Sequence, residues 1–308
     1  MPIHVLEEAN RCLQCKNPQC RKGCPISTNI PEMIRLFKDN ELETAAEMLF
    51  ANNPLSVVCS LVCNHAKQCE GHCVRGIKGS PVHISSIENY ISDSCFERIK
   101  LKMAEPNGMK AAVIGAGPAG ITIAILLAIK GYKITVFESR DKIGGIMRYG
   151  IPEFRLPKAI VQKEVDGLKA LGVKVETNMV IGRVLTIDEL FGDGFEAIFV
   201  GSGAGLPTFI GVPGENANGV YSANEYLTRI NLMKAYKENS DTPIYHAKKV
   251  AVVGGGNVAM DAARCAKRMG TDKVYIVYRR GEAEMPARLE EQHHAKEEGI
   301  EFLTLTNP

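Results

Sequence analysis

Two groups of cysteines near the N-terminus have the residue type and spacing to bind metal. The first group is Cys12, Cys15, Cys20 and Cys24, and the second is Cys59, Cys63, Cys69 and Cys73. Thiolates bind zinc as well as iron–sulfur clusters, but zinc sites favour paired C-x2-C knuckles, whereas these groups run x2-x4-x3 and x3-x5-x3. A proline follows Cys24, as it follows the fourth cysteine of ferredoxin runs. The pattern favours two [4Fe–4S] clusters, with zinc, structural thiols or disulfides as alternatives.

A glycine-rich turn, VIGAGPAG, follows an apolar run that begins at Lys110. In a strand–turn–helix unit the first glycine makes a tight turn, the second lets the backbone approach a pyrophosphate, and the third lets helix and strand pack closely. The helix N-terminus also favours the phosphate charge. Glu138, at the end of the next apolar run, is placed to accept hydrogen bonds from the ribose hydroxyls. These features predict a dinucleotide site that includes Gly115, Gly117, Pro118, Ala119, Gly120 and Glu138; the alternative is an ordinary strand–helix turn.

A second turn, VVGGGNVAMD, repeats the scheme with a GxGxxA variant at Gly254, Gly256 and Ala259, and Asn257 opens the helix. An NAD site usually has an acidic residue at the end of the next strand. Here that strand ends in Arg279 and Arg280, which suit a 2′-phosphate. The sequence therefore favours NADPH over NADH, and the alternative is a solvated pair of basic residues.

Both glycine turns must be held by strands that alternate with helices. Strand signals lie in KAAVIGAGPAG, YKITVFE, GVKVE, EAIFVGSG, KKVAVVGGG, DKVYIVYRR and IEFLTL, with helix-like runs between several of them. Such alternation is typical of doubly wound parallel sheets, so the fold class is α/β. Before Lys110 we expect helices over 30–40, 41–53 and 83–99, the first capped by the Ser27–Asn29 run with Pro31 near its first position. The predicted domains are 1–105, 106–240 and 241–308.

Composition sets the compartment and excludes some partners. The chain has 308 residues, 45% hydrophobic, and a formal net charge of +2, so nothing in its overall charge points to nucleic acid or membrane. The N-terminus lacks the apolar core of a secretory signal, and we expect a cytoplasmic protein whose thiols stay reduced. Residues 111–129 are apolar enough to cross a bilayer, but the Gly-Pro in this run breaks a single helix.

The chain resembles the small (beta) subunits of bacterial NADPH-dependent glutamate synthases. Their relatives include the N-terminal part of dihydropyrimidine dehydrogenase and the flavin subunits of electron-bifurcating ferredoxin:NADP oxidoreductases. The resemblance rests on CLQC…CP, NPLSVVCSLVC, the two glycine turns, GGIMRYGIPEFRLPK and VYRR, and it covers nearly all 308 residues. It implies a helical [4Fe–4S] domain, then two Rossmann-type domains like those of glutathione reductase that bind FAD and NADPH. The second of these is incomplete here, which predicts a C-terminally truncated chain.

The resemblance also implies which residues bind the cofactors. One cluster would be held by Cys12, Cys15, Cys20 and Cys73, and the other by Cys24, Cys63, Cys69 and Glu88. Cys59 would then be spare, and the alternative for Glu88 is a carboxylate on a helix surface. The flavin would be lined by Gly144, Gly145, Arg148 and Ile151, although the two glycines alone suggest a flexible loop. The later segment GSGAGLPTFIGVPGE would form a strand and turn that return toward the flavin.

The implied function is electron transfer by a flavoprotein. NADPH would pass a hydride to FAD, and single electrons would continue through the clusters to a larger partner subunit. That partner is most simply glutamate synthase, which forms L-glutamate from glutamine and 2-oxoglutarate. The cofactors carry this chemistry, so no side-chain acid or base is required.

Three other functions remain to be compared with this one. They are a truncated, non-catalytic module that bears clusters or zinc, the flavin subunit of another NAD(P)H:acceptor (bifurcating) oxidoreductase, and a disulfide reductase. The last is disfavoured because no cysteine pair follows the flavin turn. Cys95 and Cys265 stand alone and are better explained as buried small hydrophobes.

Overall fold

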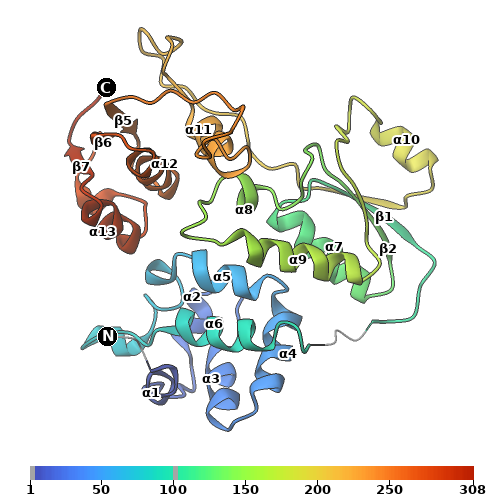
Figure 1. Ribbon diagram of the computed structural model, residues 1–308. Helices are drawn as coiled ribbons and strands as arrows, with labels where there is room; N and C mark the ends of the chain where they lie inside the picture. The colour runs from blue at the N-terminus through green and yellow to red at the C-terminus, as the bar shows by residue number, and fades with distance from the viewer. Residues whose placement is uncertain (1–3, 100–102) are drawn as a thin grey trace. The chain divides into compact units, whose positions relative to one another are not determined.

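The computed structural model describes residues 4–99 and 103–308 (Figure 1). The chain divides into two compact units, Met1–Ile143 with Ala159–Ser202, and Gly144–Lys158 with Gly203–Pro308. The predicted division into three domains remains a prediction. Residues 1–3 and 100–102, at the two ends of the predicted cluster domain, lie outside the described residues.

The first part of the first unit is helical. Its elements are α1 (Val5–Asn10), α2 (Gln19–Gly23), α3 (Ile30–Lys38), α4 (Leu42–Asn52), α5 (Ser56–Val62) and α6 (Ile84–Cys95), with short 3-10 turns at His65–Lys67 and Val74–Ile77. Met33, Ile34, Leu49, Ile87 and Ile91 form the centre of one apolar core and are at most 1% exposed. Five cysteines of the two N-terminal groups belong to this core or pack against it, namely Cys12, Cys20, Cys24, Cys69 and Cys73.

The start of α3 differs in one respect from the prediction. Pro31 occupies the first turn, as expected, and Asn29 precedes the helix. However, the Asn29 side chain makes no capping hydrogen bond. The first turn is closed instead by the backbone, where Met33 N donates to the Asn29 carbonyl at 3.0 Å. The predicted side-chain cap is therefore wrong.

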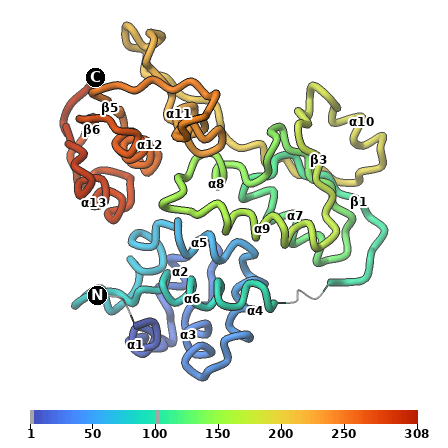
Figure 2. The backbone as a smooth tube through the Cα atoms, in the orientation of Figure 1, coloured from blue at the N-terminus to red at the C-terminus, as the bar shows by residue number. Residues whose placement is uncertain are grey.

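A four-stranded parallel sheet follows in the same unit. Its strands are β1 (Lys110–Ile114), β2 (Lys133–Phe137), β3 (Lys174–Glu176) and β4 (Ala197–Val200), in the order β3-β2-β1-β4. α7 (Pro118–Ile129) connects β1 to β2 and packs on both strands. α9 (Lys158–Ala170) leads into β3, and α10 (Ile187–Gly192) into β4. Figure 2 shows this path of the chain. Because β1 pairs on both sides, the turn after it lies at the middle of the sheet edge.

The second unit contains a smaller parallel sheet in the order β5-β6-β7. The strands are β5 (Lys249–Val253), β6 (Lys273–Tyr278) and β7 (Glu301–Thr304). α12 (Asn257–Arg268) connects β5 to β6, and α13 (Leu289–Glu297) connects β6 to β7. The unit also contains α8 (Ile146–Tyr149), α11 (Ala223–Asn231) and a 3-10 turn at Glu282–Glu284. The predicted α/β class, a helical domain followed by two parallel sheets of the dinucleotide-binding type, is confirmed.

The segment after β4 does not match its predicted form. GSGAGLPTFIGVPGE was expected to form a strand and a turn, but residues 201–222 contain neither helix nor strand (Figure 2). The run carries five glycines and two prolines between Gly201 and Gly214. Glycine weakens a strand and proline cannot donate to its ladder, which explains the irregular path.

The apolar stretch 111–129 is divided between β1, the glycine turn and α7. Among the described residues, no single helix is long and apolar enough to cross a membrane. The pair α4 and α5 reaches the required length only jointly, with a bend of 84° between the two helices. Both helices bury apolar residues inside the first unit.

Candidate functional site

Four of the predicted ligands line one cavity beside the helical core. Cys12, Cys15, Cys20 and Cys73 face it together with the apolar side chains of Ile30, Ile34 and Val82. Burial raises the pKa of Cys20 to about 11, and the neighbouring thiols Cys12, Cys73 and Cys15 add to the rise. Cationic iron would reverse this preference, because the thiolate is the ligand form of cysteine. Four soft donors around an apolar cavity suit a [4Fe–4S] cluster.

Cys24, Cys63, Cys69 and Glu88 gather at a second position. Burial is the main cause that raises the pKa of the Cys69 thiol, and the charges of Glu70, Glu88 and Cys24 contribute. The pKa of Cys63 is raised by its hydrogen bond with Cys59, by burial and by the charges of Glu88 and Cys69. These mutual effects place Cys69 within electrostatic range of Cys24, Cys63 and Glu88. That these residues hold a cluster remains a proposal.

Glu88 lies on α6 with its carboxyl group turned inward. Ser56 Oγ donates a hydrogen bond to Glu88 Oε1 at 2.8 Å, and burial raises the pKa of Glu88 to about 7. This is not the setting of a carboxylate on a helix surface. Cys59 is adjacent: a hydrogen bond with Cys63 is the main cause that lowers the pKa of Cys59 to about 7.

All ten cysteines lie among the described residues, and all are free thiols. Over residues 4–99 and 103–308, no three His, Cys, Asp or Glu side chains converge closely enough to hold a single metal ion. The first thiol set surrounds a cavity rather than a point. A cluster of several irons needs that wider arrangement.

The turn between β1 and α7 requires glycine at two positions. Gly115 has φ +99°, and a Cβ there would lie 2.4 Å from the Gly201 carbonyl oxygen. A Cβ on Gly120 would lie 1.9 Å from the Gly115 carbonyl oxygen. Gly117 precedes α7 in an extended conformation, and Pro118 and Ala119 form the first turn without a side-chain cap. The N–H groups of this turn are therefore oriented to bind a phosphate.

Glu138 supports this turn from the end of β2. Its side chain is buried, and Oε2 accepts a hydrogen bond from Ala116 N at 2.8 Å. Oε1 accepts from Ser139 Oγ at 3.1 Å and from Arg140 N at 3.0 Å. An ionised carboxylate offers about four lone-pair sites, so one remains for a ribose hydroxyl. The ribose contact remains a prediction, but the role of Glu138 in fixing the glycine turn is visible.

The other predicted flavin residues belong to the second unit. Gly144 and Gly145 have φ +124° and +51° and lead directly into α8, which contains Arg148. The chain after α8 is held by Asn231, whose Nδ2 donates to the carbonyls of Tyr149 and Gly150 at 3.3 and 3.0 Å. Ile151 follows at once. The segment is thus folded rather than a free loop, and its contact with flavin remains a prediction.

The turn between β5 and α12 has the same form. Gly254 has φ +136°, and a Cβ there would lie 3.6 Å from the Ala259 Cβ. Gly256 precedes α12 without a side-chain cap. Asn257 uses its side chain elsewhere, because Oδ1 accepts from Arg288 N at 2.9 Å. Small residues at these positions bring the backbone and the helix start close together, as a pyrophosphate site needs.

Arg279 and Arg280 are exposed directly after β6. β5 and β6 are parallel, with Val253 opposite Val277, so Gly254 and the two arginines lie at the same edge of the sheet. In doubly wound folds the nucleotide binds at this carboxyl edge. The structure therefore places both arginines at the edge of the sheet where such folds bind a nucleotide, and their contact with a 2′-phosphate remains a prediction.

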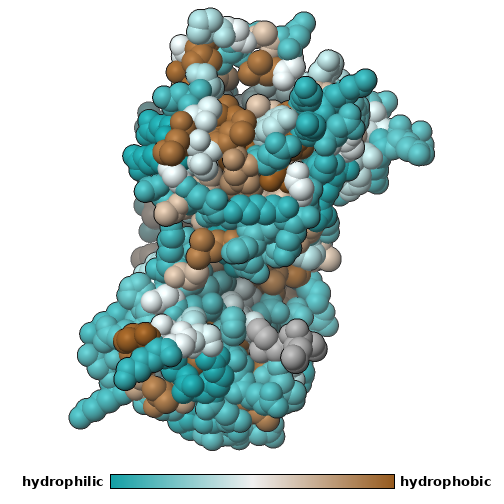
Figure 3. Space-filling model, turned by 90° about the vertical axis from the view of Figure 1, so that its left-hand side faces the viewer, coloured by the Kyte–Doolittle hydropathy of each residue, from teal (hydrophilic) through white to brown (hydrophobic). Residues whose placement is uncertain are grey.

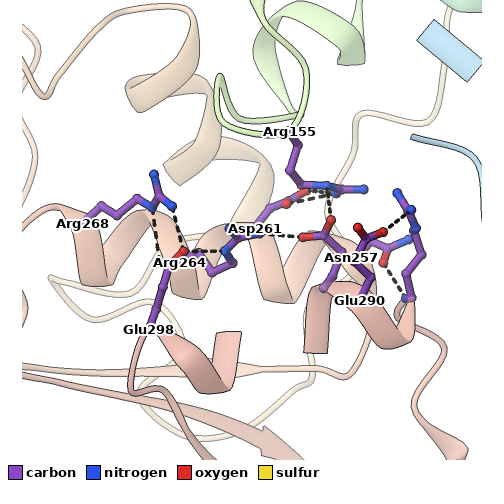
Figure 4. Close-up of polar contacts among 9 residues, drawn as sticks. Arg155, Asn257, Asp261, Arg264, Arg268, Glu290 and Glu298 are labelled. Carbon is purple, nitrogen blue, oxygen red and sulfur yellow. Dashed lines mark hydrogen bonds and ion pairs between the residues drawn. The ribbon is translucent and has the colours of Figure 1, made fainter. Parts of the chain in front are cut away.

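A buried charge network, which the sequence did not suggest, ties three segments of the second unit together (Figure 4). Arg155 Nη1 donates to both oxygens of Asp261, at 3.0 and 2.8 Å, and Arg155 Nε lies 2.9 Å from Glu291 Oε1. Arg264 bridges Glu291 and Glu298 at 2.7 and 2.9 Å. The only available signal was the charge pattern of α12, and that pattern is also typical of a solvent-exposed helix.

The network also orders the loop that carries GIPEFRLPK. The ring of Phe154 lies under the guanidinium groups of Arg264 and Arg268, at 4.3 and 4.1 Å from its centroid. Lys158 Nζ donates to the carbonyls of Ile151 and Leu156 at 2.5 and 2.9 Å. Burial is the main cause that lowers the pKa of Lys158 to about 8. These contacts fix the loop on α12 within the second unit.

Two glycine turns on parallel sheets, joined to a domain with converging thiols, define a dinucleotide-binding oxidoreductase with a metal-cluster domain. Residues 109–308 match the pyridine nucleotide-disulphide oxidoreductase family, and the chain belongs to it. Residues 2–99 match the domain described as dihydropyrimidine dehydrogenase domain II, 4Fe-4S cluster. The predicted cluster domain and oxidoreductase class are confirmed.

The relatives support the predicted resemblance. The chain is 36% identical over 301 residues to the glutamate synthase [NADPH] small chain of Escherichia coli K12, covering 96% of this chain and 64% of that protein. It is 32% identical over 309 residues to the NAD-dependent dihydropyrimidine dehydrogenase subunit PreT of Escherichia coli O157:H7, covering 98% and 71%. The chain therefore spans somewhat less than two thirds of the glutamate synthase relative. The resemblance to glutamate synthase small subunits is confirmed.

A solved structure shares the fold. FprA of Mycobacterium tuberculosis in complex with NADPH aligns with a TM-score of 0.52 and 20% identity, covering 63% of this chain and 48% of FprA. At this identity the likeness concerns the fold alone. It agrees with the paired dinucleotide-type sheets described above.

Proposed function

We propose that this chain is the electron-input part of an NADPH-dependent oxidoreductase, and that it serves a larger partner subunit of the glutamate synthase type. Bound FAD would accept a hydride from NADPH and supply single electrons to two [4Fe–4S] clusters. In the partner these electrons would support L-glutamate formation from glutamine and 2-oxoglutarate.

The observation that carries this proposal is the pairing of two separate glycine turns with a cavity lined by four thiols in one chain. A zinc-bearing interaction module has no use for two dinucleotide turns. A disulfide reductase needs a cysteine pair beside the flavin, and Cys265 in the second unit is a buried single thiol. Electron transfer uses all of these features together.

Side chains in this proposal bind and orient, and none acts as an acid or base. The α7 N-terminus and Glu138 would hold the FAD pyrophosphate and ribose. The α12 N-terminus would hold the pyrophosphate of NADPH, and Arg279 and Arg280 its 2′-phosphate. Cys12, Cys15, Cys20 and Cys73 would hold one cluster and Cys24, Cys63, Cys69 and Glu88 the other.

The decisive experiment is iron, zinc and flavin analysis of anaerobically purified protein, followed by titration with NADPH. We expect about eight irons and one FAD per chain, as two [4Fe–4S] clusters require, and loss of the oxidised flavin absorbance on addition of NADPH. Zinc in place of iron, or no metal at all, would refute the proposal. Iron without flavin would support the cluster-bearing module instead.

One observation favours a second candidate function, in which the electrons go to a partner of the dihydropyrimidine dehydrogenase type. The chain covers 71% of a subunit named for dihydropyrimidine dehydrogenase, more than its share of the glutamate synthase small chain. That relative is named NAD-dependent, so nucleotide choice separates the two candidates. Preference for NADPH supports the glutamate synthase type, and equal or better use of NADH supports the other.

A further inference from the structure

The cavity of the first thiol set has a common wall with an open surface concavity. Leu13, Val74 and Arg75 line both. The concavity has a volume of about 560 Å³, and its other lining residues are Arg11, Ile77, Lys78, Gly79 and Ser80. We call it the basic concavity. One layer of side chains therefore separates the thiol cavity from this surface.

The segments that form this region carry charge of one sign. Residues 10–25 and 71–86 contain six Lys and Arg and no Asp or Glu, whereas the whole chain has 37 basic and 35 acidic residues. Arg75 and Lys78 are both exposed. The nearest acidic residue along the chain before Cys12, Glu8, is buried and paired with Arg11 at 2.5 Å. Glu8 thus offsets the charge of Arg11, and the positive charge of the basic concavity rests on the exposed side chains of Arg75 and Lys78.

Hydrogen bonds of Arg11 hold part of the rim of the basic concavity. Arg11 Nη1 donates to the Pro81 carbonyl at 3.1 Å, and Arg11 Nη2 donates to the Ser80 carbonyl at 2.6 Å. Leu13 and Ile77 add exposed apolar surface, at 59% and 79% exposure. In Figure 3 the apolar side chains on the helical part, at the bottom of the view, form small patches among hydrophilic ones. Arginine and apolar side chains set within a polar surround are typical of protein interfaces.

The second thiol set has a different environment. Cys69 is buried, and the carboxyl groups near it belong to Glu70 and Glu88. The first set therefore lies behind the basic concavity, whereas the charged groups beside Cys69 in the second set are carboxyl groups. An electron that leaves the chain would be expected to leave at the basic concavity, because there a partner finds both close approach to a thiol set and an attractive field.

We propose that the basic concavity is the docking surface for a partner protein that carries acidic residues around its own one-electron centre. This rests on the proposed electron-input function. The partner's oxidised centre would gain one electron, and no covalent bond forms or breaks. Opposite charges would speed the encounter and orient the two centres, and such transient redox contacts need little buried area.

Binding is the direct test, with an acidic plant-type [2Fe–2S] ferredoxin as probe and the full, cluster-loaded chain. The test variant is Arg75→Glu/Lys78→Glu, and the control is Lys133→Glu/Lys169→Glu, which changes net charge equally at exposed positions on the flavin-type fold. We expect the test variant to bind ferredoxin at least tenfold more weakly than the control at low salt. We also expect the wild-type affinity to fall steeply with added salt.

Equal affinity of the two variants would overturn the proposal. A wild-type chain that prefers a single-stranded oligonucleotide to ferredoxin would also overturn it, because the partner would then be a nucleic acid. Iron analysis identifies any variant that has lost its cluster, and Lys78→Glu alone, which does not line the thiol cavity, then replaces the double variant. The affinity measurement requires no NADPH, so failure of the proposed function appears separately, as a flavin that NADPH does not bleach.

Discussion

Replacement of Arg155 by alanine is expected to destabilise the second unit locally around α12. The side chains of Arg155, Asp261 and Glu291 are at most 7% exposed. Glu291 retains Arg264 in the variant, but Asp261 loses both hydrogen bonds from Arg155. Removal of one partner from a buried ion pair typically costs about 3–5 kcal/mol, because an uncompensated charge remains.

The loss should depend on pH. Burial is the main cause that raises the pKa of Asp261 to about 6, against an ordinary value of 3.8, and Arg155 partly opposes the rise. A carboxyl group with a raised pKa favours folding most when protonated, so its contribution falls as pH rises through the interval from 3.8 to 6. Without Arg155 the pKa rises further. The penalty of the variant is therefore largest near pH 8 and smallest near pH 5.

Hydrogen exchange with mass spectrometry on peptides from α12 measures this effect. A local loss of 3–5 kcal/mol corresponds to exchange that is on the order of 10²–10³ times faster or more, after correction for intrinsic rates. Arg268→Ala is the matched control: Arg268 is 49% exposed, and its ion pair with Glu298 should contribute about 1 kcal/mol or less. Equal protection of α12 in the two variants, or a penalty that does not change between pH 5 and pH 8, would refute this reasoning.

Three further predictions concern the candidate sites. Gly120→Ala should abolish FAD binding, because the added Cβ would meet the Gly115 carbonyl. The control Gly167→Ala adds a Cβ that meets nothing within 4 Å and should leave the flavin content unchanged. Equal flavin content in the two variants would contradict this prediction. Cys20→Ser should remove about half of the bound iron, as expected for one of two clusters. The control Cys95→Ser, which changes a buried core thiol, should remove none. Iron analysis measures both variants, and a full iron content in Cys20→Ser would exclude Cys20 as a ligand. Arg280→Ala should raise the KM for NADPH about tenfold, because one charge-assisted contact is lost, and should leave the KM for NADH unchanged. Equal changes in the KM for both nucleotides would exclude 2′-phosphate recognition by Arg280.

The local features could be predicted from the sequence. Each strand is a short apolar run, and each turn contains a glycine whose positive φ is a local requirement: Gly115 has φ +99°, and Gly254 has φ +136°. The parallel order then follows from the alternation of strands and helices. Fold class and dinucleotide turns therefore emerge without knowledge of long-range contacts.

Long-range pairings could not be predicted in this way. Arg155 and Asp261 are 106 positions apart, and each reads as an ordinary surface charge. The inward turn of Glu88 depends on Ser56, 32 positions away. The grouping of Cys73 with the first three cysteines came from family resemblance, because spacing alone favoured two sets of four. Burial of a charged side chain depends on its partners in space, which local sequence patterns do not reveal.

The two thiol sets are interlaced along the chain, and this has a consequence for assembly. Cys73 lines the same cavity as Cys12, Cys15 and Cys20, while Cys24 is proposed to act with Cys63, Cys69 and Glu88. The first set is incomplete until Cys73 has been synthesised, and the proposed second set is incomplete until Glu88 has been synthesised. The early cysteines of both proposed sites therefore wait for residues that are synthesised much later. Joining ends about 50 residues apart costs about 3.5 kcal/mol of chain entropy, and bound metal would offset it. Under the proposed ligand assignment, cluster delivery should therefore act on a nearly folded domain, and loss of one cluster should loosen the fold that brings the ligands of the other together.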